Sequence, residues 1–372
     1  MKRVPLFDLH AQYLAIKPQI DEAIAAVIAE SAYIRGRFVE TFEKTYAADY
    51  GVKHCISCAN GTDSIYIVLK QLGIGAGDEV ITTANSWIAS SETITQTGAR
   101  VVFADTEDAY YTLDPATVAA KITPRTKAIL AVHLLGQAAD LHPLQSLCKE
   151  HGLHLIEDCA QAHYATYQGQ RVGTFGVAAT FSFYPGKNLG AYGDAGTIVT
   201  NDDELAAKCR SFARHGSSPT DKHDHVMEGI NSRMDGLQAA VLLAKLPHIH
   251  EWTLARRRIA AAYDAALAGV EGVRLPATRP GSEHVWHVYS VRVAQVKAVQ
   301  KKLAEAGIAT TQHYPTPLPF LKAYQYLGSR PGDFPCAERH SREMLSLPIY
   351  PEMSEDTVSY VAENLKAAIS ES

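Results

Sequence analysis

The chain has 372 residues, of which 47% are hydrophobic and 20% charged, and its 35 basic and 40 acidic residues leave a formal net charge of −5. This mixture is typical of globular proteins and excludes disordered, collagen-like and low-complexity architectures. The mild acidity gives no reason to expect nucleic acid or an anionic membrane as a partner. The length predicts about two domains.

Neither a membrane span nor a secretion signal is expected. No apolar run approaches the ~20 residues that a spanning helix needs, and Asp8, His10 and Gln12 interrupt the N-terminal segment where a signal would lie. The six scattered cysteines lack the density of a disulfide scaffold, so a cytoplasmic protein is expected. Cys55 and Cys58 form C-x-x-C inside a strand-like run, which favours buried thiols over redox or zinc chemistry, and no metal site is predicted.

The order of helical and strand-like segments predicts an α/β fold. Helical spacing of apolar residues predicts an amphipathic helix ending near Gly36. Short β-branched runs then alternate with helix-length segments, as in a mostly parallel sheet covered by helices. The expected strands are KHCIS, DEVITT, ARVVFAD, KAILAVH, LHLIED and ATFSF, and the expected helices include 61–72, 139–151 and 233–246. Strands such as WHVYSVRV and helices such as 295–306 follow, so we expect a large domain over 1–250 and a smaller C-terminal α/β domain over 251–372.

Residues just after the strands are the candidates for chemistry, because ligands gather beyond the carboxyl ends of such sheets. The turn at 60–64 is rich in small polar residues, so its free N–H groups suit a phosphate, although helix capping alone explains it equally well. Asp158 ends an apolar strand with no basic neighbour in sequence; a protonated ring nitrogen of a bound heterocycle would pair with it, and a carboxylate capped by backbone is the alternative. Lys187 lies in a glycine-rich loop, where a desolvated amine could form an imine.

Longer motifs carry a resemblance to a known family. The segments CANGTDSI, GAGDEVIT, IEDCAQAH, FSFYPGKNLGAYGDAG, INSRMDGLQAAVL and HYPTPLP span most of the chain. In these motifs the sequence resembles the DegT/DnrJ/EryC1/StrS family of sugar aminotransferases, which depend on pyridoxal 5'-phosphate (PLP). The resemblance implies fold type I, with a large PLP-binding domain and a smaller C-terminal domain.

The resemblance also implies roles for individual residues. Lys187 would carry PLP through an imine, and Asp158 would pair with the pyridinium nitrogen. The other implied cofactor contacts are Gln161 near the ring hydroxyl, Trp87 stacked on the ring, and Gly61, Thr62 and Ser182 at the phosphate. In a homodimer with shared sites, Asn231 would reach the phosphate of the neighbouring subunit and Arg233 an incoming carboxylate. His313 and Tyr314 are candidates for contacts near the sugar.

The implied reaction transfers an amino group from L-glutamate to a ketone of a nucleotide-linked sugar. The motifs around Lys187 and HYPTPLP favour amination at C3, with a C4 transaminase as the alternative. A sugar dehydratase of the same family would have a histidine in place of Lys187, and a non-catalytic regulatory relative would not need Lys187, Asp158 and Arg233.

Two groups of residues have more than one interpretation with respect to the substrate pocket. Tyr164 stands where the family often has glycine and is expected to reshape the sugar pocket, while His163 either contributes to that pocket or packs in the core. The substrate diphosphate has three candidate ligands, Arg35, Arg37 and Arg214. The alternative for each is an ordinary solvated arginine at the surface.

Overall fold

The computed structural model describes residues 2–371 and contains a seven-stranded sheet in the order β1-β9-β8-β5-β4-β2-β3. Antiparallel β9 separates β1 from β8, and the other neighbours pair in parallel. The expectation of a mostly parallel sheet is therefore confirmed. The strands are β1 (His54–Cys58), β2 (Glu79–Thr83), β3 (Arg100–Ala104), β4 (Thr126–Val132), β5 (His154–Asp158), β8 (Ala178–Ser182) and β9 (Gly196–Thr200).

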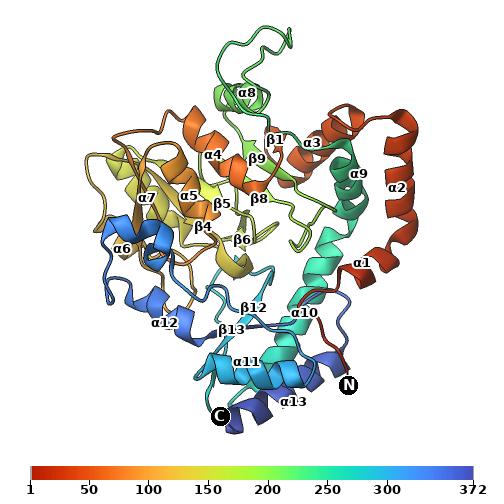
Figure 1. The fold of residues 1–372 in the computed structure, drawn as a ribbon, viewed down its shortest axis with the longest axis vertical. Helices are drawn as coiled ribbons and strands as arrows, with labels where there is room; N and C mark the ends of the chain where they lie inside the picture. The colour runs from red at the N-terminus through yellow and green to blue at the C-terminus, as the bar shows by residue number, and fades with distance from the viewer. Residues whose placement is uncertain (1, 372) are drawn as a thin grey trace.

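Helices cover both faces of this sheet, because alternate residues of each buried strand point to opposite sides. In β4, Ile129 joins the core beneath α2, α3, α7 and α9, whereas Leu130 joins the core beneath α4, α5 and α8. Figure 1 shows the resulting layers. The helices before residue 250 are α1 (Leu9–Ala15), α2 (Lys17–Glu30), α3 (Arg37–Tyr50), α4 (Gly61–Gln71), α5 (Ala89–Gln96), α6 (Pro115–Ala119), α7 (Leu141–His151), α8 (Asp203–Phe212) and α9 (Gly236–Lys245).

The C-terminal part has its own sheet and core. The long helix α10 (Ile249–Leu267) runs from the large sheet region into it (Figure 1). Its sheet has the order β10-β12-β13, and its apolar core also receives Val4 from the N-terminus, which bridges to Ile308. The proposed boundary at residue 250 stays a prediction. The elements are β10 (Val273–Arg274), β12 (Tyr289–Val293), β13 (Met344–Leu347), α11 (Val296–Glu305), α12 (Pro335–Glu343) and α13 (Glu355–Ser370).

Short elements connect the two parts. A small sheet has the order β11-β6-β7, from Ser282–Glu283, Thr166–Tyr167 and Gln170–Arg171. The 3₁₀ turns are η1 (Leu134–Gly136), η2 (Leu246–His248), η3 (Leu318–Phe320) and η4 (Lys322–Leu327).

Two helix boundaries differ from the sequence prediction. The opening helix is two helices that meet at Ile16 and Lys17, and the second ends at Glu30 because Ser31 adopts a left-handed conformation. The helix predicted from residue 233 begins at Gly236, because the preceding residues form bridges to other segments, including Ile34 with Asp235. Tertiary pairing of the backbone thus overrides local helical periodicity at this end.

Two other expectations can be compared with the structure. None of the described helices is both long and apolar enough to cross a bilayer. The thiols of Cys55 and Cys58 are buried, as predicted, and burial raises the pKa of each.

The two-sided core predicts how substitutions affect stability. Ile94→Ala, in a fully buried position of α5, should lower the free energy of unfolding by about 2 to 5 kcal/mol through lost burial and a cavity. Leu254→Ala, at a position of α10 that is 52% exposed, should change it by less than about 0.5 kcal/mol. Urea unfolding of both variants beside the wild type measures this, and equal losses would contradict the assigned burial.

Candidate active site

A cavity of about 490 Å³ opens at the carboxyl ends of β4, β5 and β8. A volume of this size suits a small organic cofactor together with a substrate. It brings together nine of the residues predicted from the sequence, namely Gly61, Thr62, Trp87, Asp158, Gln161, Ser182, Lys187, His313 and Tyr314. Asn60, Ser86, Ser90, Tyr184 and Asp194 also line it.

The start of α4 forms one end of the cavity. The side chain of Asn60 caps the helix by accepting from Asp63 N at 2.7 Å, so the amides of Gly61 and Thr62 are left for another acceptor. A Cβ on Gly61 would lie 2.7 Å from Ser182 Cβ, so only glycine allows this close approach to β8. Helix dipole, free amides and the Ser182 hydroxyl together favour a phosphate here.

Lys187 brings an amine to the cavity from the turn after β8. Its backbone N–H donates to Tyr184 O at 2.8 Å, which closes the turn after β8. Desolvation lowers the pKa of its amine to about 8, while the charge of Asp158 acts in the opposite direction. About a tenth of the amine is therefore unprotonated at pH 7, far more than for an ordinary lysine with a pKa of ~10.4, which suits a nucleophile or a base.

Asp158 ends β5 in a buried position with both oxygens partly satisfied. Oδ1 accepts from Ala160 N at 3.1 Å, and Oδ2 accepts from the Ser90 hydroxyl at 2.9 Å. Because Ser90 uses its proton for Asp158, the Ser86 hydroxyl donates to Ser90 Oγ across 2.9 Å. From the sequence, Ser86 is only one of the small polar residues after a strand, and Ser90 has no signal beyond its place near the start of the following helix.

Gln161 joins the large and small parts at the cavity wall. Its Oε1 accepts from Leu135 N at 2.6 Å, and its Nε2 donates to the Tyr314 hydroxyl at 3.1 Å. The ring of Tyr314 lies 5.9 Å from that of Trp87, which is 61% exposed. The two aromatic rings, tilted by 46° to each other, therefore offer an apolar surface at the mouth.

The two histidines near Lys187 have different surroundings. His163 is fully buried beside Phe181 and Phe183 and does not line the cavity, so it packs in the core; burial and the charge of Lys187 lower its pKa to about 3. His313 lines the cavity, and its Nδ1 lies 2.8 Å from Ser346 Oγ. Burial and Lys187 lower its pKa to about 4, so His313 is uncharged at neutral pH and can hydrogen-bond a neutral sugar.

Three sequence-selected residues lie elsewhere. Neither Asn231 nor Arg233 lines this cavity. The expectation that Tyr164 reshapes the pocket is wrong, because its ring packs against Tyr46 and Tyr50 in the core. The backbone of Tyr164 has φ of 64°, a region that glycine adopts easily, so the departure from the family pattern concerns local backbone and packing.

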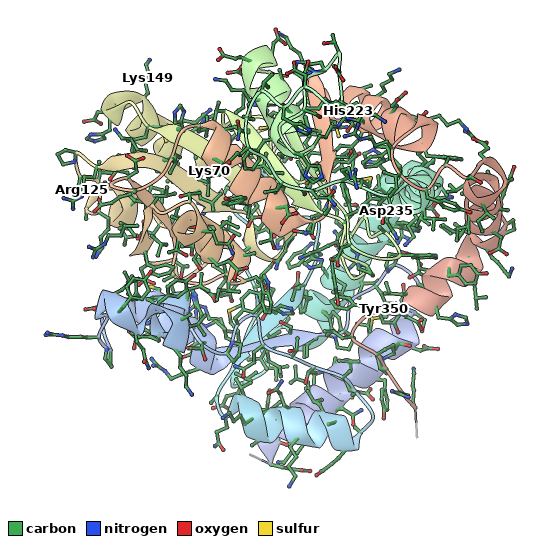
Figure 2. The ribbon with its side chains drawn as sticks, turned by 45° about the horizontal axis from the view of Figure 1, so that its top comes forward. Lys70, Arg125, Lys149, His223, Asp235 and Tyr350 are labelled. Atoms are coloured by element: carbon green, nitrogen blue, oxygen red, sulfur yellow. The ribbon has the colours of Figure 1, made fainter. Side chains whose placement is uncertain are left out.

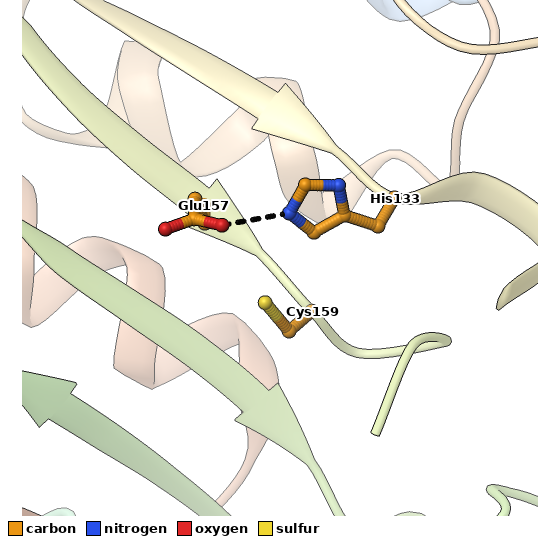
Figure 3. A group of neighbouring side chains, drawn as sticks. All are labelled: His133, Glu157 and Cys159. Carbon is orange, nitrogen blue, oxygen red and sulfur yellow. Dashed lines mark hydrogen bonds and ion pairs between the residues drawn. The ribbon is translucent and has the colours of Figure 1, made fainter. Parts of the chain in front are cut away.

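Behind the cavity lies a buried group of His133, Glu157 and Cys159 with the spacing of metal ligands (Figure 3). His133 Nδ1 accepts from Ala139 N, so the proton on Nε2 points to Glu157 Oε2, 3.1 Å away. Burial and the charges of Glu157 and Asp158 raise the pKa of the Cys159 thiol, which disfavours the thiolate that metals bind.

The carboxylate of Glu157 also accepts hydrogen bonds from the loop before β8. Its two oxygens accept backbone N–H groups at 2.6 to 2.8 Å from Gly173, Phe175 and Gly176. The imidazole and carboxylate thus have their hydrogen bonds satisfied by protein, which makes this cluster a structural brace for β4 and β5.

Comparison with known proteins identifies the family. The model of the DegT/DnrJ/EryC1/StrS aminotransferase family matches residues 15–366. The chain belongs to this family. The resemblance found in the motifs is confirmed, and with it the fold type I architecture and the aminotransferase class.

Related sequences match over nearly their full length. The chain is 46% identical to a "Pleiotropic regulatory protein" of Geobacillus stearothermophilus, over 97% of each chain. It is 43% identical to the dTDP-3-amino-3,4,6-trideoxy-alpha-D-glucose transaminase of Streptomyces venezuelae, over 94% of this chain and 92% of the relative.

Solved structures agree in fold. DesV of S. venezuelae, determined with a ketimine intermediate, superposes with a TM-score of 0.96 at 41% identity, covering 99% of this chain and 98% of DesV. NtdA of Bacillus subtilis, determined with the cofactor PMP, has a TM-score of 0.91 at 30% identity, covering 100% of this chain and 86% of NtdA.

The cavity has the chemical groups that a pyridoxal cofactor needs. The glycine-tight start of α4 accommodates a phosphate, and Asp158 has no ion pair within the described residues although it faces a cavity. The desolvated amine of Lys187 lies in the same cavity. These donors and acceptors fit the cofactor's phosphate, ring nitrogen and aldehyde respectively.

The low pKa of Lys187 can be measured on cofactor-free protein. Formaldehyde and cyanoborohydride should methylate Lys187 with a half-maximal rate near pH 8, because protonation below that pH removes the nucleophile. A free lysine derivative in the same mixture, with pKa ~10.4, serves as the internal reference. Peptide mass spectrometry from pH 6 to 10 gives both profiles, and coincident profiles would show that the cavity does not desolvate the amine.

The structural role of Glu157 predicts a second result. Glu157→Gln places an NH₂ group opposite N–H donors and should reduce the free energy of unfolding by about 2 to 4 kcal/mol. Glu150→Gln, at an exposed position of α7, is the matched control. Added zinc or EDTA should leave the thermal midpoint of the wild type unchanged; stabilisation by zinc would favour a metal site over the brace.

Proposed function

We propose that the protein is a PLP-dependent aminotransferase that moves an amino group from L-glutamate to the C3 ketone of a nucleotide-linked sugar. The observation that carries the proposal is the presence of Lys187 and Asp158 in one cavity, next to a glycine-tight helix start. We further propose that it acts as a cytoplasmic homodimer with shared sites. Six free cysteines, five of them buried, support a reducing compartment.

The cofactor would be held by residues from several elements. The amides of Gly61 and Thr62 and the Ser182 hydroxyl would bind its phosphate, and Trp87 would cover one face of its ring. Asp158 would keep the ring nitrogen protonated, with the Ser86–Ser90 chain fixing the carboxylate. When bound, PLP supplies a sink for the electron pair left after a proton leaves the donor's α-carbon.

Lys187 would act as the proton-transfer group. With the donor bound, Nζ of Lys187 would accept the proton from the donor's α-carbon, hold it, and release it later in the transfer. Its pKa of about 8 supports this role, because the amine can both accept and release a proton near neutral pH. Gln161, fixed between Leu135 N and the Tyr314 hydroxyl, would lie near the ring hydroxyl and limit ring rotation.

The preference for C3 rests on the sequence motifs and on relatives. The S. venezuelae relative is by name a transaminase that makes a 3-amino sugar. His313 and Tyr314 would contact the sugar, and their position at the cavity wall supports that role. The alternative is that the enzyme aminates a ketone at C4 of the sugar.

The homodimer would complete the site. Asn231 and Arg233 lie outside the cavity of their own subunit, as expected if they serve the neighbouring one. Asn231 would then reach the cofactor phosphate, and Arg233 would bind the donor carboxylate through a bidentate contact.

Two other functions of the family are weaker candidates. One relative has the name of a regulatory protein, but a protein without turnover would not need a desolvated lysine in the same cavity as an aspartate. A dehydratase would lack the lysine at position 187, and this chain has it.

The proposed function predicts a defined product. With PLP, glutamate and a nucleotide-linked 3-keto sugar, the enzyme should form 2-oxoglutarate and a 3-amino sugar, identified by mass spectrometry and NMR. Lys187→Ala and Asp158→Asn should each reduce kcat by at least about a hundredfold, because each removes a proton-handling group. Lys301→Ala, at an exposed position, is the control. A 4-amino product would show that the enzyme aminates C4 of the sugar and not C3. Unaltered rates in Lys187→Ala and Asp158→Asn would refute the mechanism.

A further inference from the structure

Three arginines from separate chain segments gather on the flank formed by α2, α3, α8 and α9. Arg35 lies in the turn between α2 and α3, Arg214 follows α8, and Arg233 precedes α9. Two backbone bridges bring these segments together, Ile34 with Asp235 and Arg214 with Asn231. In Figure 1 the chain after α8 projects as a loop, and in Figure 2 His223 of this loop and Asp235 lie on the flank that carries α2 and α3.

The cluster lacks the acidic partners that neighbouring arginines have. Arg37 pairs with Glu30, and Arg210 lies 2.6 Å from Glu43 Oε2. The ion pairs found among residues 2–371 include none of Arg35, Arg214 and Arg233. Arg35 Nε is in addition buried without a hydrogen-bond partner in that part of the chain. An unpaired, partly desolvated cation costs free energy, which a bound anion would recover.

The arginines also repel one another. Burial and then the charge of Arg233 lower the pKa of Arg35. Burial, followed by the charges of Arg35 and Arg210, lowers the pKa of Arg214, while Glu43 and Glu40 act in the opposite direction. Arg35 is thus influenced by Arg233 and itself influences Arg214, which fits the bridged backbone segments, on a chain whose net charge is −5.

The surroundings favour an anion with more than one charge. Guanidinium forks bind phosphate oxygens in pairs, so two of them match the two phosphates of a nucleoside diphosphate. The residues before α3 and α9, Gly36 and Asp235, make no side-chain cap, and Gly236 N donates to Tyr33 O at 2.7 Å, which ties the start of α9 to the turn that carries Arg35. Tyr33 and Ile34 are 45% and 53% exposed beside Arg35, an apolar surface that a second subunit would cover.

We propose that Arg35 and Arg214 bind the diphosphate of the nucleotide-linked sugar, beside Arg233, and that they do so for the cavity of the neighbouring subunit. The inference rests on the proposed function, and none of the three arginines lines the cavity of its own subunit. Donor and acceptor enter an aminotransferase in turn, so Arg233 can bind the donor carboxylate while Arg35 and Arg214 select the nucleotide.

Binding of dTDP and UDP to the PLP-loaded enzyme tests the anion site without turnover. Calorimetry should show a Kd for at least one of them that rises about tenfold or more in Arg35→Gln and in Arg214→Gln, since each loses a charge-assisted hydrogen bond. Arg37→Gln is the matched control, because Arg37 lies on the same segment but is paired with Glu30. Unchanged Kd values in the two variants, or no binding to the wild type, would overturn the site.

Kinetics separate this inference from the proposed function. KM for the nucleotide-linked sugar should rise by a similar factor in the two variants, whereas the rate of 2-oxoglutarate formation from glutamate alone should change by less than about threefold. A wild type that does not react with glutamate would refute the proposed function but leave the calorimetric test valid. Equal losses in both half-reactions would show that the arginines act on folding or assembly and not on the diphosphate.

Subunit hybrids test which cavity the arginines serve. Lys187→Ala subunits are mixed with Arg35→Gln/Arg214→Gln subunits and assayed at a sugar concentration far below the KM of the double variant. If the arginines serve the neighbouring cavity, each hybrid dimer has one intact site and activity returns above that of either parent. If they serve their own cavity, no hybrid site has both Lys187 and the arginines, activity does not return, and the assignment across subunits is wrong.

Discussion

The desolvated amine of Lys187, placed in the same cavity as the carboxylate of Asp158, is the constraint on which the site depends. Burial makes the neutral amine accessible near neutral pH, while the carboxylate opposes that effect by favouring the charged form. Burying an amine and a carboxylate in a dry interior costs free energy unless each group has a further polar partner. A ligand in the cavity can be that partner, because both groups line the space that it would occupy.

The adjacent acids Glu157 and Asp158 at the end of β5 have different roles, one structural and one in the cavity, because of the geometry of the strand. Successive side chains of a strand point to opposite sides. Glu157 therefore enters the core, where His133 and three backbone amides saturate it, and Asp158 enters the cavity, where serine and one amide leave it capacity for a ligand. The rigid network around Glu157 in turn holds the strand that carries Asp158.

Charge is arranged differently on the outside of the large part. Arg37 there is paired with Glu30 and Arg210 with Glu43, whereas Arg35, Arg214 and Arg233 lie on three segments that backbone bridges hold together. An anion bound between them would relieve the repulsion among these cations. The proposal that two subunits share one site rests on this arrangement and on the position of Asn231 and Arg233 outside the described cavity lining.

Local sequence patterns determined the strands, most of the helices and the positions of the motifs, because β-branched runs and helical spacing are short-range signals. They also placed Lys187, Asp158 and the turn at Gly61 after strands, which a parallel sheet brings to one edge. Only the tertiary structure decided that β9 inserts between β1 and β8, that Ser90 holds Asp158 and that Tyr164 turns into the core. These outcomes depend on contacts between residues far apart in the chain, so packing and pairing, which no local period encodes, settle them.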